Sequence, residues 1–206
     1  MALTLALCTC GPQIEVALEG DSLRAVSTVR LAGRSARATL VLAAVDLLME
    51  DAGLPPEELK RVLVTRGPGS FTGIRSGLAT ALGLAAARAM EVAAFGSLDA
   101  LAARVIGPET VWAAQPGRRG EVYARPFAVT PGEPPRAVGE LRVLRVDEAV
   151  GLGPWVAAEA LDLGAARRVA SACGCAEGLL RLARLGARPE PCEPLYVEAP
   201  PIHLQG

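Results

Sequence analysis

The residue types that most often carry out catalysis are scarce in this chain. Its 206 residues include one histidine, His203, which follows Pro200 and Pro201 near the end of the sequence. Ser-His-Asp triads, Cys-His pairs and histidine-rich zinc sites all need an imidazole held firmly in place, and residues near a chain end are usually mobile. We therefore expect His203 to be a solvated tail residue, and we predict a chain that is not an enzyme and holds no metal.

The five cysteines are the other candidates for chemistry. They occur as Cys8-x-Cys10 and Cys173-x-Cys175, with Cys192 apart. Four thiolates can bind zinc, but the usual spacing is C-x₂-C, and on a strand Cys8 and Cys10 would point to the same face. An odd number of cysteines fits a reducing compartment better than a disulfide framework. We therefore expect cysteines that are structural or merely tolerated, in a cytoplasmic protein.

A glycine-rich segment, residues 66–77, is unlike ordinary core sequence. It reads RGPGSFTGIRSG, and it follows a predicted strand and opens a predicted helix, where free N–H groups can bind an anion. Its Gly-x-Gly-x₃-Gly spacing is one residue longer than the dinucleotide-binding fingerprint, and the Gly-Lys-Ser/Thr of a Walker loop is missing. A nucleotide or anion site here is one alternative, and its residues would be Gly67, Gly69, Ser70, Thr72 and Gly73.

The elements around this loop follow from hydrophobic periodicity. Apolar runs and turn residues predict three short-looped strands, at 3–9, 14–19 and 22–31, and hence an antiparallel start to a sheet. The pattern then alternates between helix and strand, with helices at 35–49, 71–90 and 98–105 and strands at 61–65 and 92–95. The second half predicts short strands at 111–114, 122–129, 141–146, 155–158 and 169–172, and a helix at 177–185. This order indicates an α/β protein.

Composition limits the classes of partner. Acidic and basic residues nearly cancel, giving a net charge of −1, whereas unaided nucleic-acid binding usually needs a basic stripe. The longest uncharged apolar stretch, residues 76–87, is about 12 residues long, against the roughly 20 that a membrane-spanning helix needs. We therefore expect no membrane association and no direct, strong binding to nucleic acid.

The predicted helix after the glycine-rich loop is apolar nearly all round, which indicates burial on both sides. Its glycines cost helix stability, and close contact with another backbone is the usual compensation. We therefore predict that the first two helices form a docking face for another protein, although an ordinary central helix is an alternative. The predicted contact residues are Ala38, Val41, Leu42, Val45 and Met49 on the first helix and Phe71, Gly73, Ile74, Gly77, Leu78, Thr80 and Ala81 on the second.

Three segments resemble the TsaB (YeaZ) family. The run from Arg66 to Arg75, continued through Ala85, is similar to the long signature motif of that family. Two shorter segments, GEVY at 120–123 and EPLYV at 193–197, match its later motifs. The resemblance implies an actin-like, ribonuclease-H-like (ASKHA) α/β fold with two mixed-sheet domains. We place these at residues 1–104 and 105–206, with the last segment packing back on the first domain.

The resemblance also implies a function. TsaB-type proteins are non-catalytic scaffold or activator subunits that bind TsaD, the catalytic subunit that forms N6-threonylcarbamoyladenosine at position 37 of tRNA, and TsaE, an ATPase, joins them. The implied partners are therefore TsaD in a heterodimer, TsaE in a larger complex, or a second copy through the same helices, with tRNA contacted only indirectly. No cofactor is expected on the isolated chain, and ATP only within the complex.

Several positions depart from the family pattern. Cys8-Thr9-Cys10 stands where relatives have Asp-Thr-Ser, and Ala36 replaces a histidine. An aspartate before the GEVY strand falls at Pro116 or Gln115, and Glu198 stands in place of an arginine. These differences argue against an independent nucleotide site and leave the helix pair intact. Two alternatives to the TsaD-binding subunit stay open, a nucleotide-binding enzyme that uses the Gly67–Gly73 loop and a homo-oligomer without TsaD.

Overall fold

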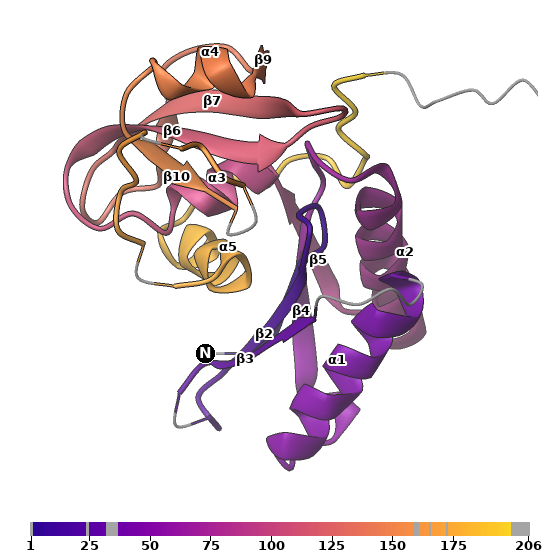
Figure 1. Ribbon diagram of the computed structural model, residues 1–206. Helices are drawn as coiled ribbons and strands as arrows, with labels where there is room; N and C mark the ends of the chain where they lie inside the picture. Colours follow the sequence, from indigo (N-terminus) through magenta and orange to yellow (C-terminus); the bar gives the residue numbers. More distant parts are fainter. Residues whose placement is uncertain are drawn as a thin grey trace, which may run out of the picture.

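The computed structural model describes residues 2–23, 25–31, 37–158, 161–164, 166–171 and 173–198. The positions of Ala36 and His203, which bear on the predictions above, lie outside the described residues. Two β-sheets form the frame of the molecule, and helices pack on their faces (Figure 1).

The first sheet has the strand order β3-β2-β1-β4-β5. Its strands are β1 (Leu3–Cys8), β2 (Ile14–Glu19), β3 (Ser27–Leu31), β4 (Leu59–Thr65) and β5 (Glu91–Phe95). The first three strands pair antiparallel, and β4 and β5 continue the sheet parallel to β1. The predicted antiparallel start followed by alternating helices and strands is confirmed.

Both faces of this sheet are buried, which explains why its central strands read as nearly continuous apolar runs. Successive side chains of a strand point to opposite faces. Leu3, Leu5 and Leu7 of β1 therefore join the hydrophobic cluster on one face, while Ala6 and Cys8 join the cluster on the other. The sheet thus needs a cover on each side.

Helices α1 (Arg37–Asp51) and α2 (Phe71–Arg88) lie side by side on one face of the first sheet. On the other face lies α5 (Cys175–Arg184). It also packs against α3 (Ser97–Ala102), which in turn covers the second sheet (Figure 1). Helix α2 ends where Ala89 adopts a left-handed conformation with φ of 52°. Among the described residues, no helix combines the length and hydrophobicity needed to cross a membrane.

The second sheet has the order β10-β6-β7-β8, with β9 also paired to β7. Its strands are β6 (Glu109–Pro116), β7 (Glu121–Val129), β8 (Arg136–Ala137), β9 (Arg142–Arg145) and β10 (Trp155–Ala157). Strands β6 and β7 pair antiparallel, whereas β10 runs parallel to β6. The short helix α4 (Val146–Val150) packs against β9 and β7 on the outer side of this sheet.

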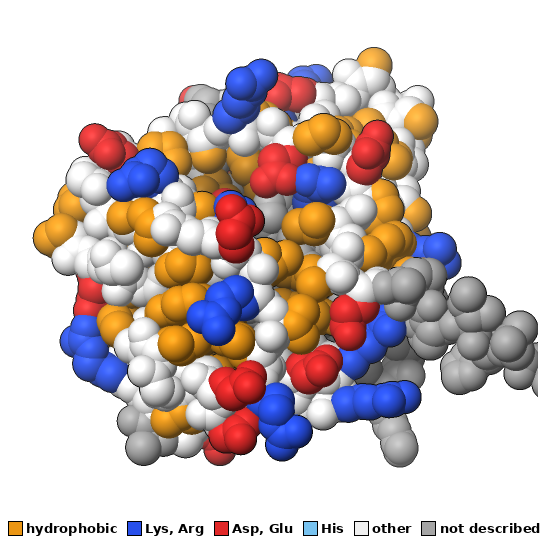
Figure 2. Space-filling view, turned by 90° about the horizontal axis from the view of Figure 1, so that it is seen from above, with side chains coloured by type: hydrophobic (Ala, Val, Ile, Leu, Met, Phe, Trp, Pro, Cys, Tyr) orange, Lys and Arg blue, Asp and Glu red, His pale blue; other side chains and the backbone are white. Residues whose placement is uncertain are grey.

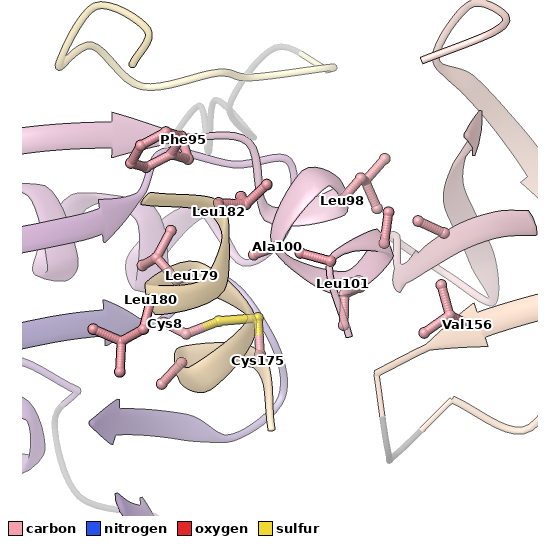
Figure 3. Packing of buried hydrophobic residues seen from close by; sticks show 14 of the residues in the cluster. Cys8, Phe95, Leu98, Ala100, Leu101, Val156, Cys175, Leu179, Leu180 and Leu182 are labelled. Carbon is pink, nitrogen blue, oxygen red and sulfur yellow. A yellow bond between two sulfur atoms is a disulfide. The ribbon is translucent and has the colours of Figure 1, made fainter. Parts of the chain in front are cut away.

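One hydrophobic cluster joins the two lobes, each lobe being a sheet with its helices. Leu98 and Leu101 of α3 and Leu179 of α5 pack between Phe95 of the first sheet and Val156 of the second (Figure 3). Cys8 and Cys175 form a disulfide at the edge of this cluster, with their Cα atoms 6.1 Å apart. The odd number of cysteines favoured a reducing compartment over a disulfide framework, but the fold brings this pair, 167 positions apart in sequence, into bonding contact.

Several predicted boundaries differ from the observed ones. The strand predicted at 22–31 begins at Ser27, and the strand predicted at 141–146 ends at Arg145, one residue before α4 begins. The strand predicted at 169–172 is reduced in the described residues to an isolated bridge between Ser171 and Val105. Helix α5 follows the second sheet in sequence but packs on β1 and β2 of the first.

Candidate functional site

The glycine-rich loop fastens the start of α2 to the end of β1. The Ser70 hydroxyl accepts a hydrogen bond from the Gly73 N–H at 3.2 Å and caps the helix. The Ser70 N–H donates to the Cys10 carbonyl at 2.8 Å. The first turn of α2 is thus held by its own cap and by the strand beside it.

The glycines of this loop make room for the chain's own backbone. Gly67 and Gly69 have φ values of 119° and 144°, a region that other residues rarely adopt. A Cβ on Gly67 would lie 2.4 Å from the Leu195 carbonyl oxygen, and one on Gly69 would lie 2.3 Å from that of Cys10. Close packing within the chain therefore explains the glycine spacing that suggested a nucleotide loop. Of the other two loop residues, Ser70 caps the helix and Thr72 is exposed.

Most of the residues predicted to contact a partner point into the chain's own core. The buried ones are Val41, Val45, Met49, Gly73, Ile74, Gly77, Leu78 and Ala81. A Cβ on Gly77 would lie 2.2 Å from the Thr9 hydroxyl oxygen, so the small edge of α2 packs on Thr9 of the same lobe. The prediction that this edge contacts a partner is therefore wrong, because the first sheet occupies that space.

The remaining predicted contact residues lie closer to the surface. Leu42 is 48% exposed, and Phe71 and Thr80 are half-buried. Ala38 is outside the residues whose side chains are described. For Leu42, Phe71 and Thr80 a role in docking stays a prediction.

The outward surface of the two helices carries an apolar face that the sequence analysis did not separate from the core. We define the outer helix face as the exposed apolar and small residues Leu42, Ala43 and Leu47 of α1 and Ala79, Leu82, Gly83 and Ala86 of α2. Its three leucines are 48%, 52% and 47% exposed, and they make up half of the large hydrophobic residues found exposed in the described part of the chain. Exposed apolar side chains on two neighbouring helices make this face a candidate interaction surface.

Charged side chains form no patch comparable to this apolar face on the surface seen in Figure 2. Figure 2 shows acidic and basic side chains interspersed on the face seen from above, without a large cluster of one sign. Several charges pair, such as Arg88 with Glu57 and Arg61 with Glu91. The hydrogen bond from Arg88 also lowers the pKa of Glu57. On the face seen in Figure 2, charge therefore marks no binding patch.

The cysteines are brought together differently from a zinc site. In the described part of the chain, no group of three or more His, Cys, Asp or Glu side chains is arranged to hold a metal ion. Cys8 is bonded to Cys175, whereas the buried Cys10 thiol donates to the Thr65 hydroxyl at 3.1 Å. Burial raises the pKa of the Cys173 thiol, which leaves little reactive thiolate.

A cavity of about 200 Å³ lies between the two lobes beside the start of α2. The first lobe contributes Cys10 and Ser70 to its lining, and the second contributes Arg118 and Tyr123. The buried Tyr123 hydroxyl donates to the Glu198 carboxylate at 2.6 Å. Burial and, next, this carboxylate raise the pKa of Tyr123 above its usual range. Sequence analysis marked Glu198 only as a departure from a family pattern, and no local signal linked it to Tyr123.

The two-lobed frame defines an α/β protein of the actin-like, ribonuclease-H-like class, with mixed sheets in both lobes. Comparison with known proteins agrees with this class. The family model described as TsaD, tRNA N6-adenosine threonylcarbamoyltransferase, matches residues 31–163. A solved structure of YeaZ from Pseudomonas aeruginosa superposes with a TM-score of 0.75 at 27% identity, covering 96% of this chain and 100% of that one.

Sequence relatives point the same way. The Bacillus subtilis tRNA threonylcarbamoyladenosine biosynthesis protein TsaB is 33% identical over 110 residues, which are 50% of this chain and 46% of that protein. A protein of Mycobacterium tuberculosis is 32% identical over 154 residues, covering 74% of this chain and 70% of its own length. The chain therefore belongs to the TsaB (YeaZ) type of the TsaD-related family, as the motifs at 66–85, 120–123 and 193–197 implied.

Proposed function

We propose that this chain is a non-catalytic subunit in the synthesis of N6-threonylcarbamoyladenosine in tRNA, and that it acts by binding a TsaD-type partner through the outer helix face. Membership in the TsaB (YeaZ) type supports the process. The exposure of Leu42, Leu47 and Leu82 on two neighbouring helices is the observation that carries the binding site.

The outer helix face suits a protein partner for two physical reasons. Burying exposed leucine side chains is favourable by roughly 25 cal/mol per Å² of apolar surface removed from water. Apart from its own stretch of helix, Gly83 has no atom within 4 Å of where its Cβ would be, so a partner backbone can approach closely there. A cytoplasmic location and indirect contact with tRNA belong to this proposal.

The non-catalytic part of the proposal is supported by what the described residues do. Cys8 is bonded in a disulfide and the Cys10 thiol donates a hydrogen bond to Thr65. The glycine-rich loop packs against its own chain. We accordingly propose that the chain binds no cofactor on its own and that ATP acts within the complex. Calorimetric titration of the isolated chain with ATP separates this proposal from the nucleotide-binding alternative, which requires saturable binding.

The docking site is tested with Leu47→Asp and Leu82→Asp. Each places a charge on the outer helix face, and we expect binding to the TsaD-type protein of the same organism to weaken at least tenfold, about 1.4 kcal/mol. Ile106, 66% exposed and on neither helix, supplies the matched control Ile106→Asp. Affinity is measured by biolayer interferometry and folding by thermal melts.

Three results are distinguishable. Weaker binding by both helix variants with an unaffected control supports the proposal. Wild-type affinity in Leu47→Asp and Leu82→Asp contradicts it. If the wild-type chain instead forms a dimer that both variants abolish and binds no TsaD-type protein, light scattering will show that the same face serves a second copy.

A further inference from the structure

The segment from Glu190 to Glu198 runs along the first lobe and ends on the second. Its beginning is held by backbone hydrogen bonds, from the Glu190 N–H to the Ala94 carbonyl at 2.9 Å and from the Leu195 N–H to the Arg66 carbonyl at 2.8 Å. The Arg66 side chain adds a hydrogen bond to the Glu193 carbonyl at 2.7 Å and an ion pair with Glu190. This part is firmly attached.

Beyond Leu195 the contacts among the described residues of the segment are made by side chains. The Tyr196 ring lies 4.8 Å from the Phe71 ring, and the Arg75 side chain donates to the Tyr196 hydroxyl at 3.1 Å. Both partners are at the start of α2. Tyr196 therefore rests on the first lobe and directs the chain across the interlobe cavity.

Glu198 then reaches the second lobe. Its carboxylate accepts the hydrogen bond from Tyr123 and lies 3.8 Å from the Arg118 guanidinium. The Glu198 and Arg118 side chains are about a third exposed, 32% and 37%, and exposed ion pairs are weak. The end of the segment is thus the part that opens most readily, because side-chain contacts near solvent give way before backbone pairing does.

We propose that residues 195–198 are a lid over the interlobe cavity and that Glu198 is its latch, held by Tyr123 and Arg118. Leu195, Tyr196, Val197 and Glu198 all line the cavity of about 200 Å³. Opening the lid widens access to the cavity wall at Cys10, beside the half-buried Ser70. Since the hydrophobic cluster around α3 and α5 joins the lobes independently of this segment, the lid opens without the lobes separating.

Cys10 reports on the lid. It lies outside the disulfide, its thiol donates to Thr65, and the residue is 2% exposed and lines the cavity beneath residues 195–198. Alkylation by N-ethylmaleimide without reductant, followed by peptide mass spectrometry, measures its rate of exposure. Cys173, a free thiol in the segment leading into α5, does not line this cavity and supplies an internal reference in the same sample.

Two variants release the latch. Glu198→Gln removes the charge, and Tyr123→Phe removes the hydroxyl that binds it. Because the charge-assisted hydrogen bond is weakened in Glu198→Gln and removed in Tyr123→Phe, we expect Cys10 to be alkylated faster in both, and roughly tenfold faster in Tyr123→Phe. Glu193→Gln is the matched control, since it makes the same change in an exposed side chain of the segment. Its Cys10 rate should equal that of the wild type, and the Cys173 rate should be constant throughout.

The opposite results are equally clear. Wild-type Cys10 rates in Glu198→Gln and Tyr123→Phe, or no Cys10 modification in any form, overturn the lid. Cys10 and Cys173 rates that rise together indicate general loosening and also overturn it. Amide exchange over residues 195–198 gives a second measurement for Glu198→Gln. The substitution changes a partly exposed side chain and leaves the core intact.

Discussion

Single residues of this chain show how burial and neighbours decide the state of a titratable group. Asp99 lies on α3 and lines a cavity with Arg125 and Glu190. Burial raises its pKa above the ordinary 3.8, Glu190 raises it further, and Arg125 opposes both. Asp147 is the opposite case, because a hydrogen bond from the exposed Arg145 lowers its pKa.

These directions predict the pH dependence of stability. A raised folded-state pKa favours folding below the unfolded value, and this contribution is lost as pH rises through the folded pKa. Asp99→Asn should therefore gain stability relative to the wild type as pH rises above the unfolded pKa of Asp99 and through its folded pKa. Asp147→Asn should show the opposite sign, losing relative stability above its unfolded pKa. Urea unfolding at several pH values measures both, and parallel profiles for the two variants contradict the assignment.

Among the elements, α2 shows how two glycines of one helix serve different surfaces. Gly77 packs on Thr9, whose hydroxyl donates to the Gly73 carbonyl at 2.8 Å, so α2 lies against the end of β1. Gly83 faces open space on the outer helix face. The helix is apolar all round because one side is core and the other is the proposed docking face.

The two glycines make a matched pair of variants. Gly77→Ala places a methyl group against Thr9, and we expect it to reduce the free energy of unfolding by about 1–3 kcal/mol. Gly83→Ala meets no neighbour and should raise it by about 0.5–1 kcal/mol through helix propensity. Urea denaturation measures both changes. Equal stabilisation by the two variants would show that Gly77 is not packed as described.

At the scale of the whole molecule, α5 holds the two halves of the sequence together. It follows the second sheet yet packs on the first, and Cys175 at its start is bonded to Cys8 of β1. The Glu15 carboxylate accepts hydrogen bonds from the N–H groups of Cys175 and Ala176, which caps α5 from β2. The disulfide and these hydrogen bonds thus both attach the start of α5 to the first sheet.

The disulfide gives a whole-molecule prediction. Because it closes a loop of 167 residues, its loss should reduce the free energy of unfolding by about 2–4 kcal/mol. Cys8→Ser combined with Cys175→Ser is compared with the wild type, with and without reductant. Reductant should lower the wild-type melting temperature and leave the double variant unchanged. Cys192→Ser, in a cysteine outside the disulfide, is the control, and a reductant-insensitive wild type contradicts the prediction.

The sequence by itself determined much of the architecture. The three antiparallel strands and the helix–strand alternation were predictable because period-two and period-3.6 patterns are local properties of the chain. The motifs at 66–85, 120–123 and 193–197 were sufficient for the family. The predicted bounds of α2 were also close to the observed ones, since Ser70 and the apolar run after it are local signals.

Only the tertiary structure decided which side of each helix is core. An all-apolar helix has no periodic signal that separates a buried face from an exposed one, so Gly77 was assigned to a partner although it packs on Thr9. The Cys8–Cys175 disulfide and the contact of Tyr123 with Glu198 join residues far apart in sequence. Such pairs depend on how sheets and helices stack, and no local sequence pattern predicts which distant residues come into contact.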